Sequence, residues 1–144
     1  GGGATIESYG ITTRGLRGGV QGNATPKTLT DAAQALKAAL GDDVVHWMSH
    51  LPLSWSSGNL WAVHAGADPQ RGMQDQSNRV LLWGHPEFEI TPRTDGVWVA
   101  HGHVARKRPT AAKGRITLDT GACTTGRLTA CVVHPDGHYD FLQT

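Results

Sequence analysis

The fold is decided by Val97-Trp-Val-Ala-His101-Gly-His103 and Asn59-Leu-Trp-Ala-Val-His64-Ala-Gly66, two short apolar runs that each end in histidine. Each run predicts a buried strand that ends at a tight turn containing glycine, with an imidazole at its C-terminal edge. Open sheets bind ligands and metals in the crevice at their strand ends. We therefore expect the two runs to bring imidazoles together, where they could bind one metal ion.

Composition narrows the class of protein. A chain of 144 residues with 38% hydrophobic and 17% charged residues is globular and long enough for one domain with a core. The formal net charge of +1 argues against nucleic acid and against an anionic membrane surface as partners. No apolar run approaches the roughly 20 residues that span a bilayer. The chain does not open with a basic and then apolar signal segment, and its two cysteines, Cys123 and Cys131, are too few for a disulfide framework. We therefore expect a cytoplasmic protein with reduced thiols.

The pattern of apolar residues changes along the chain. Residues 1–57 are predicted to be mainly helical and residues 58–144 mainly β, within one α+β domain. Helices are expected at 4–9, 26–40 and 42–51, and strands at 60–63, 97–100, 115–119, 128–133 and 138–142. Thr30 or Asp31 is expected to cap the second helix. The third helix is expected to bury an apolar face made of Val44, Val45, Trp47, Met48 and Leu51.

Two of the eight histidines stand out as metal ligands, because His64 and His103 each follow an apolar strand and lie beside a glycine. Asp119 also ends a predicted strand, and it either orients an imidazole or simply caps its turn. His46 and His50 have the i, i+4 spacing of a helical metal pair, but no Glu follows His46. Trp55 lies in a Ser-rich loop expected near the mouth of the site, where it would contact substrate.

Five motifs together resemble the second half of the calcineurin-like metallophosphoesterases. They are Val63-His64-Ala65-Gly66, Leu81-Leu-Trp83, Ala100-His-Gly-His103, Gly114-Arg-Ile-Thr-Leu-Asp-Thr-Gly-Ala122 and Gly126-Arg-Leu-Thr-Ala130. The match is closest to the bacterial branch that is similar to serine/threonine protein phosphatases and diadenosine tetraphosphatase. The resemblance implies part of a β-sandwich flanked by helices, which is four-layered (αββα) in the complete family fold.

The resemblance also implies a hydrolase with two divalent metal ions (Mn, Fe or Zn), in which a metal-bound hydroxide attacks the phosphorus of a phosphoprotein or a small phosphoester. His64 and His103 map to two late metal ligands of the family. His101 is the rival for the second position and otherwise lies behind the ligands with Asp119. Where many relatives carry a phosphate-binding Arg, this chain has Gly84-His85, so His85, Arg14 and Arg17 are the candidate phosphate contacts.

The family's first half is not represented ahead of these histidines. Its motifs Asp-x-His, Gly-Asp-x-x-Asp-Arg-Gly and Gly-Asn-His-Glu supply the bridging Asp, the Asn ligand and the acid that protonates the leaving group, and none precedes His64 here. We therefore expect the C-terminal part of a longer enzyme, completed by an N-terminal half or by a partner subunit. The alternatives are a non-catalytic, partner-binding fragment, a mononuclear zinc domain, and a diadenosine tetraphosphatase-like hydrolase.

Overall fold

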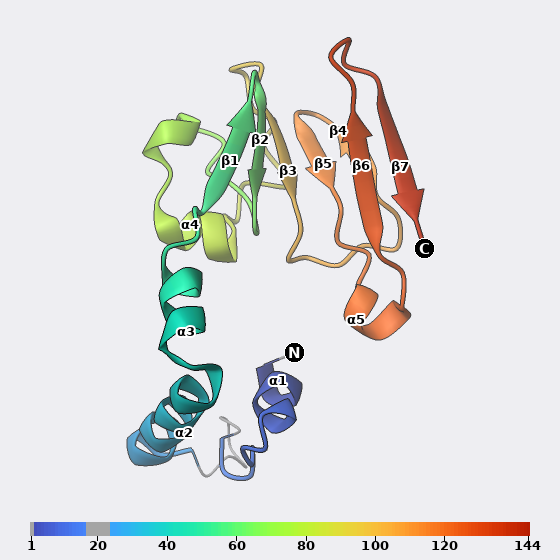
Figure 1. Ribbon diagram of the computed structural model, residues 1–144. Coiled ribbons are helices and arrows are strands. Elements are labelled where there is room, and N and C mark those ends of the chain that lie inside the picture. Colours follow the sequence, from blue (N-terminus) through green and yellow to red (C-terminus); the bar gives the residue numbers. More distant parts are fainter. Residues whose placement is uncertain (1, 17–23) are drawn as a thin grey trace. The chain divides into compact units, whose positions relative to one another are not determined.

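The computed structural model describes residues 2–16 and 24–144 and divides the chain into two compact units, Gly1–Leu51 and Pro52–Thr144. Among the described residues, the first unit is helical and every strand lies in the second (Figure 1).

The first unit contains three helices, α1 (Gly2–Ser8), α2 (Pro26–Leu40) and α3 (Asp42–Ser49). Helix α2 begins at Pro26, whose fixed φ suits the first helical turn, and it ends at Gly41. The expected cap at Thr30 or Asp31 is wrong. Thr25 caps the helix, because its extended backbone leaves its hydroxyl free to accept the Thr28 N–H, at 3.1 Å.

The buried apolar face expected on the third helix is also wrong. Neither α2 nor α3 has a buried residue, and Trp47 is 62% exposed. Val44, Met48 and Leu51 are exposed as well. Within the described part of the first unit, α3 packs against α2, and this contact leaves the apolar face exposed.

The second unit is built on a five-stranded sheet of order β1-β2-β3-β5-β4. Its strands are β1 (Ser54–Ser57), β2 (Leu60–Val63), β3 (Trp98–His101), β4 (Thr110–Ala112) and β5 (Arg115–Thr117). The central strands β2, β3 and β5 are parallel, and β1 and β4 are antiparallel edges. The loop expected around Trp55 is therefore wrong, since Trp55 pairs with Ala62 as part of β1.

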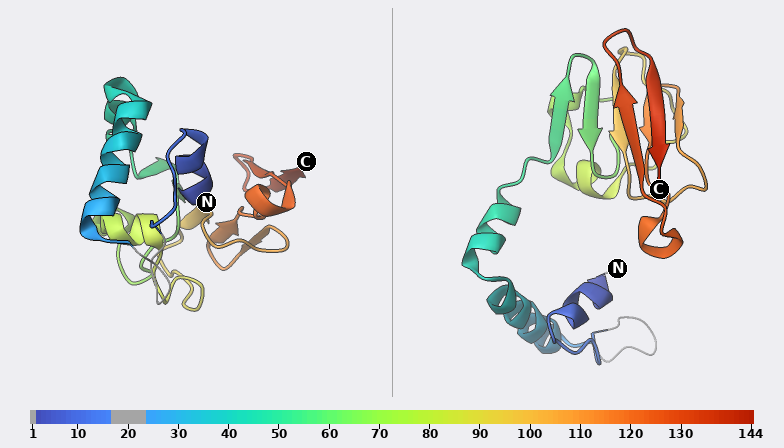
Figure 2. Two further views of the ribbon diagram at one scale, coloured as in Figure 1. Left: turned by 90° about the horizontal axis from the view of Figure 1, so that it is seen from below. Right: turned by 45° about the vertical axis from the view of Figure 1, so that its right-hand side comes forward.

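A two-stranded antiparallel sheet faces the first sheet and completes a small sandwich (Figure 2). It consists of β6 (Thr129–Val133) and β7 (Tyr139–Gln143), which follow the short helix α5 (Ala122–Thr125). Side chains from both sheets line the space between them, including Ala62 and Ala100 on one side and Thr129 on the other. The α+β class expected from the sequence is confirmed.

The other face of the five-stranded sheet carries the core. It is covered by the 3-10 turn η1 (Met73–Asp75), by helix α4 (Asn78–Trp83) and by the loop that holds Phe88. The buried cluster is Ala67, Met73, Leu81, Phe88 and Val99. Across the described residues, every helix is too short or too polar to span a bilayer.

Gly66 allows this core to close. A Cβ at Gly66 would lie 2.7 Å from Cδ1 of Phe88, closer than atoms of two side chains approach. The sequence suggested a turning role for this glycine, but its φ is not in the left-handed region. Gly66 is required for close packing, and this packing holds the segment after His64 against the core.

Candidate metal centre

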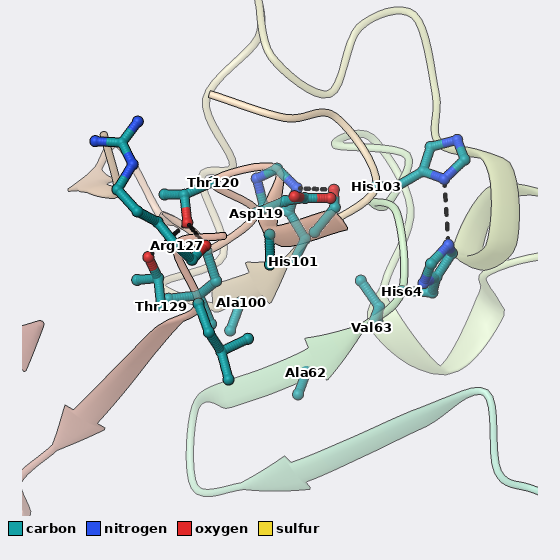
Figure 3. Close-up of a pocket in the computed structure, with 14 residues that line it drawn as sticks. Ala62, Val63, His64, Ala100, His101, His103, Asp119, Thr120, Arg127 and Thr129 are labelled. Carbon is teal, nitrogen blue, oxygen red and sulfur yellow. Dashed lines mark hydrogen bonds between the residues drawn. The ribbon is translucent and has the colours of Figure 1, made fainter. Parts of the chain in front are cut away.

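The predicted metal ligands meet at one edge of the sheet. His64 follows β2, His103 follows β3 and Asp119 follows β5, and because these three strands are parallel, their carboxyl ends lie side by side. They border a pocket of about 380 Å³ (Figure 3). Its lining is Ala62, Val63, His64, Ala100, His101, Gly102, His103, Leu118, Asp119, Thr120, Ala122, Arg127, Leu128 and Thr129.

The two imidazoles point toward each other (Figure 3), with His64 Nε2 3.2 Å from His103 Nδ1. Both side chains are exposed to solvent. Two nitrogens bound at about 2.1 Å to the same ion, at adjacent positions, are separated by about 3.0–3.4 Å. The observed separation therefore fits a pair of ligands on one divalent cation, and imidazole nitrogen suits Mn, Fe and Zn.

The backbone at His103 adopts a strained, positive-φ conformation. His103 has φ +69°, and the Val104 N–H donates to the Gly102 carbonyl at 2.8 Å, which closes a γ-turn around the histidine. γ-Turns with positive φ at the central residue are rare, and such backbone states cost about 1–3 kcal/mol. From the sequence, Gly102 was expected to adopt the backbone conformation of the turn. In the structure, His103 and not Gly102 has the positive φ.

His101 is buried and does not reach His64 or His103 through any hydrogen bond of the described structure. Its Nδ1 donates to the Gly102 carbonyl at 3.2 Å, and its Nε2 accepts from the Thr117 hydroxyl at 3.1 Å. The ring packs edge-on against Phe88. Burial lowers the pKa of His101, so the neutral form is favoured. His101 is therefore a hydrogen-bonded core residue of the strand.

Asp119 behaves as a turn cap in this structure. Its Oδ1 accepts the Gly121 N–H at 2.8 Å, and its side chain packs beside Gly102. Of the two roles that the sequence left open, the turn cap is the one with a hydrogen bond in the structure. That an imidazole is oriented by Asp119 stays a prediction.

Of the three candidate phosphate contacts, only His85 lies in the same unit as the pocket. His85 does not line it; its Nδ1 accepts the Glu87 N–H at 3.2 Å and its Nε2 lies 3.9 Å from an oxygen of Asp68. Arg14 belongs to the first unit and is described only there. Arg17 lies outside the described residues. None of the three phosphate roles gains a contact from the structure, and they stay predictions.

Trp55 is not at the mouth of the pocket. It lines a second cavity, of about 490 Å³, at the other end of β2, together with Trp98 and Tyr139. The aromatic neighbour of the histidines is Trp83, which is 70% exposed and stands edge-on to His103 with ring centroids 5.9 Å apart. The sequence analysis quoted Trp83 within the motif Leu81-Leu-Trp83 but did not predict that it would lie beside His103.

Arg127 is the second residue that the sequence analysis missed. It lines the pocket at the end opposite to His64 and His103 (Figure 3). It stands in the quoted motif Gly126-Arg-Leu-Thr-Ala130, but no local feature of that motif places it at the sheet edge. Thr120, beside it, is buried and was likewise not singled out.

At this pocket, the structure brings together two candidate metal ligands, the imidazoles of His64 and His103. Within residues 2–16 and 24–144, no cluster of three or more His, Cys, Asp and Glu side chains could hold a metal ion. Catalytic metal sites in proteins use three or more protein ligands with an open position. The described residues by themselves thus supply fewer ligands than such a site uses, and His64 and His103 as metal ligands stay a prediction.

Comparison with known proteins supports the fold of this chain but not a particular activity. No protein-family model matches the chain, and no curated protein matches its sequence. The fold is similar to the crystal structure of "a putative diadenosine tetraphosphatase", with a TM-score of 0.58 and 24% sequence identity. The match covers 81% of this chain and 61% of that chain, so this chain spans about three fifths of its length. The fold of this chain is thus similar to part of that structure, as expected from the sequence.

Proposed function

We propose that this chain contributes part of the active site of a metal-dependent phosphoesterase, which hydrolyses a phosphomonoester or a phosphoprotein. The observation that supports this most is the 3.2 Å approach of His64 Nε2 to His103 Nδ1 at the carboxyl ends of parallel strands. Both imidazoles are exposed and close together, which supports a role as metal ligands more than a role in core packing.

A divalent cation bound there would polarise a phosphoryl oxygen and stabilise charge in the transition state. His64 and His103 would hold two of its coordination positions, because their facing nitrogens are 3.2 Å apart. The remaining ligands and a second cation are proposed to come from an N-terminal half or from a partner subunit. Mn, Fe and Zn all suit imidazole combined with carboxylate ligands.

A diadenosine tetraphosphatase-like activity is the second candidate. The structure with the similar fold bears that name, and one observation on this chain favours it. Trp83 is exposed beside His103, and an indole ring at this place offers a stacking surface for a nucleobase.

The full-length gene product is the protein to test, with p-nitrophenyl phosphate as substrate and Mn²⁺, Zn²⁺ or Fe²⁺ added. We expect His64→Ala and His103→Ala each to lower kcat/KM more than about 100-fold, beyond the 10- to 100-fold typical for residues behind the metal ligands. His134→Ala, on the exposed β6–β7 hairpin, is the matched control and should retain the activity.

Circular dichroism and the urea midpoint show whether each variant is folded. A folded His64→Ala, His103→Ala double variant that keeps the wild-type rate would exclude these residues as metal ligands. A wild-type protein without turnover under any of the three metals would instead favour the non-catalytic, partner-binding fragment. Diadenosine tetraphosphate in parallel decides between the two candidate activities.

A further inference from the structure

The second cavity, of about 490 Å³, lies within the second unit at the amino ends of β2 and β3. Its walls include Trp55, Leu60 and Trp98 of the five-stranded sheet, and His134 and Tyr139 of the β6–β7 hairpin. Strand β2 has four residues that rise about 3.3 Å each, so the cavity is about 13 Å away from the strand ends that precede the histidines. It is therefore a place distinct from the candidate metal centre.

Strand pairing explains why two indole rings reach this cavity. Leu60 pairs with Trp98 at the start of both strands. Trp55 pairs with Ala62, which lines the space between the two sheets. Paired residues, and residues two apart in a strand, point to the same face of a sheet. Trp55, Leu60 and Trp98 therefore share the sheet face that is turned toward the β6–β7 hairpin.

Both walls of the cavity are held by hydrogen bonds at their turns. On one wall, the Asn59 side-chain amide donates to the Gly96 carbonyl and the Trp98 N–H donates to the Asn59 carbonyl, both at 2.9 Å. On the other wall, the His134 N–H donates to the His138 carbonyl at 2.8 Å. Ligand sites are usually formed before the ligand binds and have volumes of about 300–1,000 Å³. The size and the fixed walls of this cavity fit such a site.

The lining is aromatic and, among the described residues, contains no Lys, Arg, Asp or Glu. The side chains of Trp55 and Tyr139 are not consumed by core packing, since these residues are 59% and 40% exposed. Indole and phenol rings stack on flat aromatic ligands. A charged ligand would lose its hydration here without gaining a partner of opposite charge, so a neutral ligand is favoured.

The polar groups that a ligand could use are few. Ser57 and Tyr139 are exposed lining residues, and each has a hydroxyl that can donate and accept. The amide nitrogen of Asn59 already donates within its turn, and His134 Nε2 lies 3.1 Å from an oxygen of Asp140. A sugar needs partners for most of its hydroxyl groups, whereas a flat heteroaromatic ring needs only a few at its edge.

We propose that this cavity binds a neutral, flat heteroaromatic molecule of the purine-base class. The ring faces stack on Trp55 and Trp98 from one sheet and on Tyr139 from the other, and the ring edge exchanges hydrogen bonds with the hydroxyls of Ser57 and Tyr139. A ligand bound here is remote from the candidate metal centre, so its binding is independent of the proposed phosphoesterase function.

The test measures the Kd of adenine, glucose and benzoate for the full-length protein by ligand-observed NMR. Adenine is neutral and flat with polar groups at its edge, glucose is neutral but not flat, and benzoate is flat but anionic. Adenine should bind with a Kd below about 1 mM, which is within reach of an efficient ligand of its size. Glucose and benzoate should bind at least about tenfold more weakly.

Trp55→Ala should weaken adenine binding at least about fivefold, which is the lower end expected for the loss of one stacking ring. Trp55→Phe, which keeps a ring face, should retain part of the affinity. Tyr139→Leu, on the opposite wall, should also weaken binding about fivefold or more. Trp47→Ala removes a tryptophan that is 62% exposed on α3, and as the matched control it should bind adenine as the wild type does.

Circular dichroism shows whether each variant is folded, and Tyr139→Leu decides if Trp55→Ala does not fold. Unchanged adenine binding in the folded variants overturns the site, and glucose or benzoate that binds as tightly as adenine overturns the ligand class. Adenine binding that is lost in Trp83→Ala but kept in Trp55→Ala places the ring beside His103 and also overturns the inference. Adenine binding that depends on Trp55, in a protein without phosphoesterase turnover, upholds it and contradicts only the proposed function.

Discussion

At the scale of single residues, the site depends on two backbone positions. His103 carries a positive φ that few residues with a Cβ adopt, and Gly66 allows Phe88 to lie directly against the main chain. Phe88 in turn supports the ring of His101, at a centroid distance of 4.8 Å. A substitution at Gly66 is therefore expected to disturb the packing at the ends of both β2 and β3, which precede His64 and His103.

We expect Gly66→Ala to lower the free energy of unfolding by about 1–3 kcal/mol, because the added methyl group overpacks the ring of Phe88. Gly102→Ala is the matched control, since its Cβ would lie 3.6 Å from Asp119, an ordinary contact. Urea unfolding of both variants measures the difference. Equal midpoints for the two variants would show that Phe88 can move away from Gly66.

At the scale of elements, one buried arginine joins two loops that cover the core. Arg93 is 2% exposed and donates to the carbonyls of Asp68 and Arg71, at 3.0 and 2.9 Å. It also pairs with the carboxylate of Asp95. The bonds from Arg93 to the two carbonyls tie the segment that follows His64 to the loop before β3.

The Arg93–Asp95 pair predicts a pH dependence of stability. The hydrogen bond from Arg93 lowers the pKa of Asp95 below 3.8. The contribution of a group with a lowered folded-state pKa is fully present above its unfolded pKa and is lost as the pH falls through its folded pKa. We therefore expect the urea midpoint to fall from about pH 4 downward, and to fall less steeply in Asp95→Asn.

Asp43→Asn, on the exposed helix α3, should keep the wild-type slope and serves as the control. A slope in Asp95→Asn equal to the wild-type slope between about pH 4 and 2.5 would show that other carboxylates account for the acid sensitivity.

At the scale of the whole molecule, the described residues form a small core, and the metal centre proposed at His64 and His103 would be incomplete. Seven hydrophobic residues are buried, all in the second unit, whereas sixteen large hydrophobic residues are exposed across both described units. Five strands face only two across the sandwich. Exposed apolar surface of this extent is typical of an interface with further protein.

Metal stoichiometry tests this interpretation. After reconstitution with Mn²⁺ and Zn²⁺ and dialysis, we expect residues 1–144 to retain at most one loosely held ion, because two imidazoles alone bind weakly. Atomic absorption on a folded sample measures the number of ions. About two retained ions would contradict the incomplete centre, and one tightly held Zn²⁺ would favour the mononuclear zinc domain.

Local sequence determined the elements whose signals lie within a few residues. Helix α2 has the predicted bounds, because proline favours its first turn and glycine its end. Strand β2 also matches its predicted range, because an apolar run between turn residues favours a buried strand. The same runs predicted which two histidines stand at strand ends, and they meet at 3.2 Å.

Only the tertiary structure decided what depends on distant pairing. Strand β1, with the sequence Ser-Trp-Ser-Ser, has no apolar alternation and exists because it pairs with β2. The place of Trp83 beside His103, and of Arg127 at the far end of the pocket, depends on how α4 and β5 lie around the sheet. The difference arises because helix capping and apolar periodicity act over a few neighbouring residues. Strand pairing and side-chain packing instead join residues that are far apart in the chain.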